Sequence, residues 1–324
     1  MLSFLSLLLP FSLSFCLSAL FLRYAIPVLR KQKVGQHILA IGPSWHSAKE
    51  GTPTLGGLAF LLSVPITLLV SLLALKSSLS YAISLVLLYA LANGLIGLID
   101  DGTKLKNRKN QGLLPWQKLF LQILFSVCFL FLFDRNVADL SVLSLPFFHT
   151  ALSFGFLSFP LLTFLLVGIV NCANLTDGVD GLAGTVSLVI SVFFISEGLL
   201  SGDDAIVCLS AALGGGVLGF LIFNRHPARV FMGDTGSLFL GAILTGMAFL
   251  LRMPLVMIFS SFVFILEGFS VVLQVLYFKR TGKRLFKMAP YHHHLEKCGW
   301  SEGKIVFAFA ATALLSVLFA HFAL

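Results

Sequence analysis

The chain has 324 residues, of which 58% are hydrophobic and 11% are charged, and its formal net charge at pH 7 is +8. Soluble proteins carry charged side chains on about 25% of their residues, so this composition excludes a soluble globular domain. Apolar runs without charge, close to the roughly 20 residues that cross a bilayer as a helix, recur along the whole sequence. The composition therefore predicts an integral membrane protein.

Ten apolar runs predict the fold class, an all-α polytopic membrane protein with about ten transmembrane helices in a single domain over residues 1–324. Helices are expected because each spanning segment must satisfy its own backbone hydrogen bonds in lipid. Long Leu, Phe and Ile runs argue against the alternating strands of about 10 residues that build a membrane barrel. The ten runs are Leu2–Leu22, Pro53–Leu75, Leu79–Ile99, Trp116–Phe133, Leu152–Ala173, Leu182–Leu199, Ala205–Phe223, Gly236–Leu251, Pro254–Phe278 and Lys304–Phe322.

The basic residues predict the orientation of these helices. The first run lacks a preceding basic segment and is followed by basic residues, which indicates a retained helix with its amino end outside rather than a signal peptide. With ten alternating runs, 19 of the 22 Lys and Arg residues fall on one side, and only Lys76, Arg135 and Arg252 fall on the other. The positive-inside rule makes the basic side cytoplasmic and both termini periplasmic. Topology and anionic lipid explain the net charge, so no nucleic-acid partner is expected.

Five polar, glycine-rich segments fall on the predicted cytoplasmic side, whereas the outer loops hold isolated acids without such motifs. This distribution predicts one active site on the cytoplasmic face. The segments are "KEGTPTLGG" (Lys49–Gly57), "LIDDGTKLKNRKNQG" (Leu98–Gly112), "NCANLTDGVDGLAG" (Asn171–Gly184), "NRHPARVFMGDTGS" (Asn224–Ser237) and "RLFKMAPYHHHLEKCGW" (Arg284–Trp300).

The paired acids Asp100 and Asp101 end the third apolar run. Neighbouring side chains on a helix point about 100° apart, so we expect one acid to face a metal or basic loop and the other the reacting atoms. An alternative is that both mark a helix end among lipid headgroups, but the helix dipole disfavours acids at a C-terminus. The basic run Lys104–Lys109 suits phosphates or anionic headgroups, and Lys118 lies unusually at the start of an apolar helix.

Asn171, Asn174, Asp177 and Asp180 recur every three residues and form one polar stripe if the helix continues through them. Two glycines interrupt the stripe, so we expect a broken helix that lines a water-filled cavity. Acids inside a membrane are costly and usually functional. These residues alone leave a transport site possible.

Asp234 follows a glycine and precedes an apolar run, so it either caps a helix or binds a ligand that approaches the glycine backbone. Phe231 offers a ring for stacking nearby. Scattered carboxylates beside basic side chains suit Mg²⁺, which is usually bound by protein carboxylates and substrate phosphates together.

Three consecutive histidines, His292–His294, cannot easily converge on one ion and suit a pyrophosphate or hydroxyl-rich substrate. The small residues of "LGGGVLGF" (Leu213–Phe220) indicate close helix packing.

Together, "GTPTLGG", "DD", "NLTDGVDGLA", "FMGDTGSL" and "KMAPYHHHLE" occur in this order between about Arg30 and Trp300. The sequence resembles the phospho-N-acetylmuramoyl-pentapeptide transferases, a branch of the polyprenyl-phosphate N-acetylhexosamine-1-phosphate transferase superfamily. The triple histidine after "KMAP" favours this branch over the sister transferases that move N-acetylglucosamine-1-phosphate, which remain the alternative. A secondary transporter is a more remote alternative, because no repeated halves are visible.

The resemblance implies a Mg²⁺-dependent catalytic domain in the bacterial inner (cytoplasmic) membrane, commonly dimeric. Such enzymes transfer phospho-N-acetylmuramoyl-pentapeptide from UDP-MurNAc-pentapeptide to undecaprenyl phosphate, giving lipid I and UMP. The matching positions imply Asp234 as the principal metal ligand with Asp177 beside it. The implied catalytic groups are Asp100, Asp101, Asp234 and His292. The implied substrate-binding residues are Lys49, Lys118, Asn171, Asn174, Asp177, Asp180, Asn224, Phe231 (stacked on uracil), Gln274, His293 and His294.

Overall fold

The computed structural model describes residues 2–32, 51–75, 80–107, 112–148 and 150–324. Nearly all of the regular structure in these residues is helical, and a helix lies over each of the ten predicted runs. Within these described ranges, nine helices are long and apolar enough to cross a membrane, and a further apolar helix runs through Leu58–Ser71. These helices are α1 (Leu2–Lys31), α2 (Leu58–Leu75), α3 (Tyr81–Asn107), α4 (Pro115–Asn136), α5 (Ser158–Thr176), α6 (Leu182–Ser201), α7 (Asp204–Asn224), α8 (Gly233–Leu250), α10 (Phe262–Thr281) and α12 (Glu302–His321).

The four largest corrections to the predicted boundaries concern the first, third, fifth and ninth runs. Helix α1 does not end at Leu22 but continues to Lys31. Leu152, the expected start of the fifth span, lies in a two-stranded antiparallel hairpin of β1 (Val142–Leu145) and β2 (Thr150–Ser153), which precedes α5. The ninth run is interrupted, since a short turn η3 (Pro254–Val256) and one helical turn α9 (Met257–Ser260) precede α10. The third helix does not end at Ile99 but continues for two more turns, because Lys104 and Lys106 favour its last turn.

Helix burial divides the bundle into a centre and a periphery. Most of α7 and α8 is buried, whereas α1, α4, α10 and α12 expose most of their surface. The predicted role of "LGGGVLGF" is confirmed at α7, because a Cβ at Gly215 would strike the backbone of Phe11 in α1. A Cβ at Gly219 would lie 2.7 Å from the carbonyl oxygen of Phe15. The absence of side chains at these positions allows α1 and α7 to pack along most of their length.

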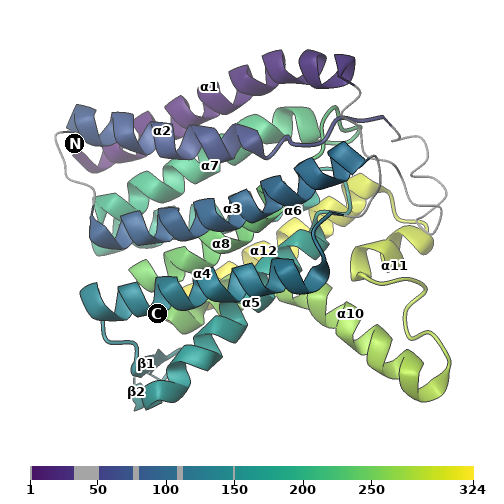
Figure 1. Cartoon of the computed structure of the whole chain (residues 1–324). Coiled ribbons are helices and arrows are strands. Elements are labelled where there is room, and N and C mark those ends of the chain that lie inside the picture. The colour runs from purple at the N-terminus through teal and green to yellow at the C-terminus, as the bar shows by residue number, and fades with distance from the viewer. Residues whose placement is uncertain (1, 33–50, 76–79, 108–111, 149) are drawn as a thin grey trace.

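The two chain termini lie at the same end of the bundle, together with the β1–β2 hairpin (Figure 1). The opposite end carries the last turns of α1 and α3 and the short helix α11 (Tyr291–Lys297). Helix α10 leans away from the other helices toward this end, and its final turns expose apolar side chains such as Val272 and Leu276. The alternation of helix directions agrees with the predicted topology, and the assignment of the α11 end to the cytoplasm stays a prediction.

Candidate active site

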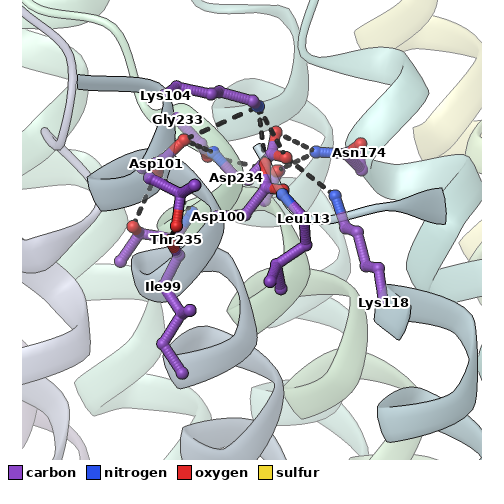
Figure 2. Close-up of polar contacts among 12 residues, drawn as sticks. Ile99, Asp100, Asp101, Lys104, Leu113, Lys118, Asn174, Gly233, Asp234 and Thr235 are labelled. Carbon is purple, nitrogen blue, oxygen red and sulfur yellow. Dashed lines mark hydrogen bonds and ion pairs between the residues drawn. The ribbon is translucent and has the colours of Figure 1, made fainter. Parts of the chain in front are cut away.

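Four helices meet at the end of the bundle opposite the termini, and their polar side chains point toward one another (Figure 2). They are α3 near its end, α4 and α8 at their starts, and α5 at its end. Oxygen atoms of Asp100, Asp101 and Asp234 all lie within 4.8 Å of one another. The fold thus brings the acid pair of one sequence motif against the acid of another more than 130 residues away.

Asp101 holds the start of α8 in place. Its carboxylate accepts hydrogen bonds from the backbone N–H of Asp234 (3.2 Å), the backbone N–H of Thr235 (2.9 Å) and the Thr235 hydroxyl (2.7 Å). The first N–H groups of a helix have no partner within the helix, so Asp101 is the cap of α8. Its side chain is only 5% exposed. The possibility that Asp234 caps this helix is therefore wrong, because Asp101 does so from a neighbouring helix.

Asp100 has different partners from its neighbour, as the angle between adjacent helix positions predicts. One oxygen accepts a hydrogen bond from the backbone N–H of Leu113 (2.7 Å), and the other lies 2.6 Å from the ammonium of Lys104. Close approach of the Leu113 segment depends on Gly112, since a Cβ there would strike the Asp100 carboxylate. Asp100 therefore faces a basic group and a loop, whereas Asp101 faces a helix start.

Asp234 is the centre of the cluster. Its Oδ2 accepts hydrogen bonds from the ammonium groups of Lys118 (2.7 Å) and Lys104 (3.0 Å), and its Oδ1 accepts one from the amide of Asn174 (2.9 Å). The same Asn174 amide also donates to the hydroxyl of Ser237, at 2.7 Å. The Asp234 side chain is 19% exposed, so this carboxylate is accessible, unlike that of Asp101. The structure therefore brings Lys118, Asn174 and Asp234 into direct contact, and their roles toward a metal or substrate stay predictions.

Lys104 is a site residue that the sequence reasoning did not single out from the basic run around it. Its ammonium lies within 4.0 Å of all three clustered acids. A signal was present in the sequence, because Lys104 follows Asp100 by four residues and Asp101 by three, and such pairs share one face of a helix. The signal depended on the helix continuing past Ile99, which the hydropathy pattern did not indicate.

The cluster fits an oxygen-seeking divalent cation. Three carboxylates offer oxygens at mutual distances compatible with one ion, and hard oxygen ligands suit Mg²⁺. Asp177, the other predicted metal ligand, is not one of these three residues. Desolvation raises the pKa of the Asp177 carboxyl well above its ordinary value, and the nearby charges of Asp234, Asp101 and Asp180 raise it further. Asp177 therefore lies within electrostatic reach of the cluster, and its role as a ligand stays a prediction.

The predicted polar stripe is broken, as expected. Helix α5 ends at Thr176, Gly181 adopts a left-handed conformation with φ of 79°, and α6 begins at Leu182. Asn224, at the end of α7, supports this turn from outside the stripe. Asn224 accepts a hydrogen bond from the backbone N–H of Gly181 (3.0 Å) and donates one to the carbonyl of Val230 (2.9 Å). Because Asn224 is buried, it braces the turn against the loop that leads to α8.

Asp180 is a second brace of the same turn. Its Oδ2 accepts a hydrogen bond from the backbone N–H of Ala228 (3.0 Å) and lies 3.2 Å from the ring of His226. Glu302, at the start of α12, lies 3.3 Å from the same ring nitrogen and accepts a hydrogen bond from the backbone N–H of Asp180. Sequence reasoning missed His226 and Glu302. These contacts give Asp180 a structural role, and substrate binding by it stays a prediction.

Asn171 lies one helical turn before Asn174, and its side chain contacts other residues than Asp234. Its amide donates to the side chain of Gln122 in α4 (2.8 Å) and to the carbonyl of Val167. Gln274, in α10, accepts hydrogen bonds from the backbone N–H groups of residues 285 and 286, at 3.1 and 2.8 Å. Both side chains therefore hold neighbouring segments, and contacts of either residue with a substrate stay predictions.

Phe231 lies where two of the sequence motifs meet. Its backbone N–H donates to the carbonyl of Pro53 (2.8 Å), and its carbonyl accepts from the N–H of Gly56 (2.8 Å). The N–H of Gly57 donates to the carbonyl of Met232 at 2.9 Å. This ladder places "GTPTLGG" beside "FMGDTGSL", immediately before Asp234. Lys49 lies outside the described residues.

The three histidines of α11 point to different partners. His292 is buried and pairs with Glu267 in α10, and His293 pairs with Glu296 one turn along its own helix. His294 accepts a hydrogen bond from the backbone N–H of Lys287 (3.1 Å). Each of the three rings therefore has a different partner, and contacts of His292, His293 and His294 with a substrate stay predictions.

Comparison with known proteins decides the family. A sequence model described as "Glycosyl transferase family 4" matches residues 82–252. The chain is 41% identical over 320 residues to "Phospho-N-acetylmuramoyl-pentapeptide-transferase" of Clostridium botulinum (strain Alaska E43 / Type E3), covering 98% of this chain and 95% of that protein. It is 42% identical over 285 residues to the protein of that name in Clostridioides difficile (strain 630), covering 88% and 87%. It is 43% identical over 312 residues to the protein of the same name in Bacillus mycoides (strain KBAB4), covering 95% of this chain and 94% of that protein.

The chain belongs to the phospho-N-acetylmuramoyl-pentapeptide transferase family. The segment matched by the family model includes Asp100, Asp101, Lys118 and Asp234, and therefore the whole carboxylate cluster. The histidines of α11 lie beyond that segment but within the range covered by the full-length relatives. The resemblance to this family in the sequence is confirmed.

Proposed function

We propose that this protein transfers phospho-N-acetylmuramoyl-pentapeptide from its UDP carrier to undecaprenyl phosphate, releasing UMP and forming lipid I. The family supports this reaction, since the similar proteins are named as phospho-N-acetylmuramoyl-pentapeptide transferases. We also propose that the enzyme is Mg²⁺-dependent, acts at the cytoplasmic face of a bacterial inner membrane and works as a homodimer. The basic loops support the orientation, and the family resemblance supports the dimer.

The observation that carries the proposal is the cluster of Asp100, Asp101 and Asp234 with Lys104 and Lys118 at one end of a membrane bundle. The reaction brings a lipid phosphate and a water-soluble diphosphate together at the membrane surface. Both reactants are anions, so catalysis must rest on positioning and on neutralising charge. Two ammonium groups and a carboxylate set suited to a divalent cation provide both functions in one place.

In the proposed reaction, a phosphate oxygen of the lipid attacks the sugar-proximal phosphorus of the donor. The bond from that phosphorus to the bridging oxygen breaks, and the electron pair leaves with UMP. The ammonium groups of Lys104 and Lys118 bind the phosphate oxygens, because both extend toward Asp234 from different helices. Asp234 and the adjacent carboxylates would hold a Mg²⁺ ion, which would supply positive charge to the diphosphate and to the departing phosphate.

The neighbouring acids have separate tasks in this proposal. Asp100, which contacts Lys104 and the Leu113 loop, orients the lipid phosphate or accepts its proton. Asp101 positions Asp234 by holding the start of α8, since all of its observed partners are N–H and O–H groups of that start or Lys104. Attack is direct, without a covalent phospho-enzyme. Phosphate trapped on either acid in a single turnover would contradict this direct route.

The test of the proposed function is UMP release by the purified full-length protein with UDP-muramoyl-pentapeptide, undecaprenyl phosphate and Mg²⁺. UMP should appear in proportion to lipid I and should require the lipid phosphate. UDP-N-acetylglucosamine, offered in competition, should not be consumed. Consumption of that sugar nucleotide would instead assign the protein to the sister reaction, and solute uptake by proteoliposomes without UMP release would indicate a transporter.

A further inference from the structure

His292 and Glu267 form a buried pair between α11 and α10. One carboxylate oxygen of Glu267 accepts a hydrogen bond from the backbone N–H of His292 (3.1 Å), and the other lies 2.9 Å from its ring Nδ1. The side chains are 1% and 0% exposed. A carboxylate that receives two donors from one residue fixes both the position of that residue and the plane of its ring.

The other ring nitrogen of His292 is unusual. Its Nε2 is buried and has no hydrogen-bond partner within the described part of the chain. It lies directly against Gly178, where an added Cβ would strike it. Gly178 follows Asp177 in the turn between α5 and α6, so the free nitrogen is aimed at the backbone of the candidate site. Buried polar atoms are almost always paired, and an unpaired one needs an explanation.

Stability alone does not explain this pair. A buried ion pair is often no more stabilising than apolar residues of similar volume, because both groups lose their hydration. Among the described residues there are three other His–Glu pairs, all more exposed: His293 with Glu296, His321 with Glu197 and His226 with Glu302. Of these four pairs, only His292 with Glu267 combines full burial of both partners with a ring nitrogen left unpaired and aimed at a site loop.

We propose that Glu267 is a positioning residue for the transfer reaction: it holds a proton on Nδ1 of His292 and directs Nε2 toward the Gly178 turn as a hydrogen-bond acceptor. An ionised carboxylate only accepts hydrogen bonds, so the nitrogen that faces it carries the proton. A carboxylate on one ring nitrogen sets the tautomer and leaves the other nitrogen as an acceptor. This inference rests on the proposed function, in which His292 acts on the sugar-phosphate part of the donor.

The kinetic test uses the full-length enzyme with Mg²⁺ and the two proposed substrates. Glu267→Gln should lower kcat by about 100-fold, since a positioned acid–base side chain contributes about 10²- to 10⁴-fold, and should leave KM for the nucleotide donor unchanged. His292→Gln should lower kcat by at least as much. The double variant should be no slower than His292→Gln, because Glu267 acts only through that ring.

The matched control is Glu197→Gln, which changes another Glu paired with a histidine but lies at the opposite end of the bundle. It should retain wild-type kcat. A second variant protects the test if Glu267→Gln folds poorly. Gly178→Ala leaves Glu267 intact and pushes on Nε2, so it should also lower kcat. Wild-type kcat in folded Glu267→Gln, or further loss in the double variant, overturns the proposal.

Ring-nitrogen NMR of ¹⁵N-histidine-labelled protein gives a readout that does not depend on turnover. The His292 signals, identified by their loss in His292→Gln, should show a protonated Nδ1 and an unprotonated Nε2. In Glu267→Gln this pattern should change, while in Glu197→Gln it should persist. An unchanged His292 pattern without the carboxylate overturns the positioning role. If the wild-type protein releases no UMP, the proposed function is wrong. The NMR result then still shows whether Glu267 sets the tautomer of His292.

Discussion

Gly97 offers a test of how the active site is assembled without changing any group that meets the substrates. It lies on α3, one turn before Asp100, and faces the start of α8. A Cβ at Gly97 would strike backbone atoms of Asp234 and Thr235, which cannot rotate away as a side chain can. Non-bonded carbon atoms need about 3.5 Å, so Gly97→Ala should push α3 and α8 apart by roughly 1 Å at the carboxylate cluster.

This displacement should affect stability and activity together. Inserting a methyl group into a packed interior costs about 1–3 kcal/mol, and a misplacement of about 1 Å at a reacting centre can lower the rate about 100-fold. We therefore expect Gly97→Ala to lower the melting temperature moderately and UMP release by about two orders of magnitude. The assays are thermal unfolding in detergent and initial rates of UMP release at saturating donor.

Two alanine variants separate displacement from general loosening. Gly246→Ala strains the same pair of helices at the opposite end, where the new Cβ meets the side chain of Val86 at 2.9 Å, so it should lower stability and retain activity. Gly168→Ala, in α5, has nothing within 4 Å of the new Cβ and should behave as wild type. Wild-type UMP release by Gly97→Ala would show that the spacing of α3 and α8 at this point does not control activity. An equal loss of UMP release in Gly246→Ala would show the same.

Three further outcomes follow from the contacts of the cluster. Asp234→Asn should abolish UMP release and weaken Mn²⁺ binding measured by electron paramagnetic resonance, and undiminished Mn²⁺ affinity would contradict its role as a ligand. Lys118→Met should lower kcat by about 10²- to 10³-fold, the range for losing one charge-stabilising donor, whereas a change confined to KM would assign Lys118 to binding alone. Asp180→Asn should destabilise the fold by about 1–3 kcal/mol in thermal unfolding while the purified enzyme keeps most of its kcat. A stable but inactive variant would show that Asp180 contacts the substrate.

Hydropathy was sufficient to locate the helices, because lipid imposes one requirement on every spanning segment. It could not locate the residues at which the helices begin and end, because polar contacts determine those positions. Lys104 extends α3 through pairs with acids on two helices, and the hairpin at Leu152 depends on its partner strand β1. A sequence read locally shows the spacing of Lys104 from Asp100 and Asp101, but neither its contact with Asp234 nor the strand that pairs with Leu152.

The candidate site shows the same division. The polar motifs and their gathering at one end follow from topology, and the central position of Asp234 follows from the family. The identity of the acid that caps α8 could not be predicted in this way. The N–H groups that donate to Asp101 lie on a helix that begins more than 130 residues later. Glu267 was overlooked because it lies in an apolar run, where a single acid gives no motif and its partner His292 is contributed by another helix.

The two ammonium groups at Asp234 also matter while the protein is being made. With its acids ionised, the cluster of three carboxylates and two lysines carries one net negative charge instead of three. Mutual repulsion among the acids is thereby reduced by residues of the chain itself. A newly inserted chain can therefore close its helix bundle before any divalent cation arrives, and protein washed with chelator should remain folded.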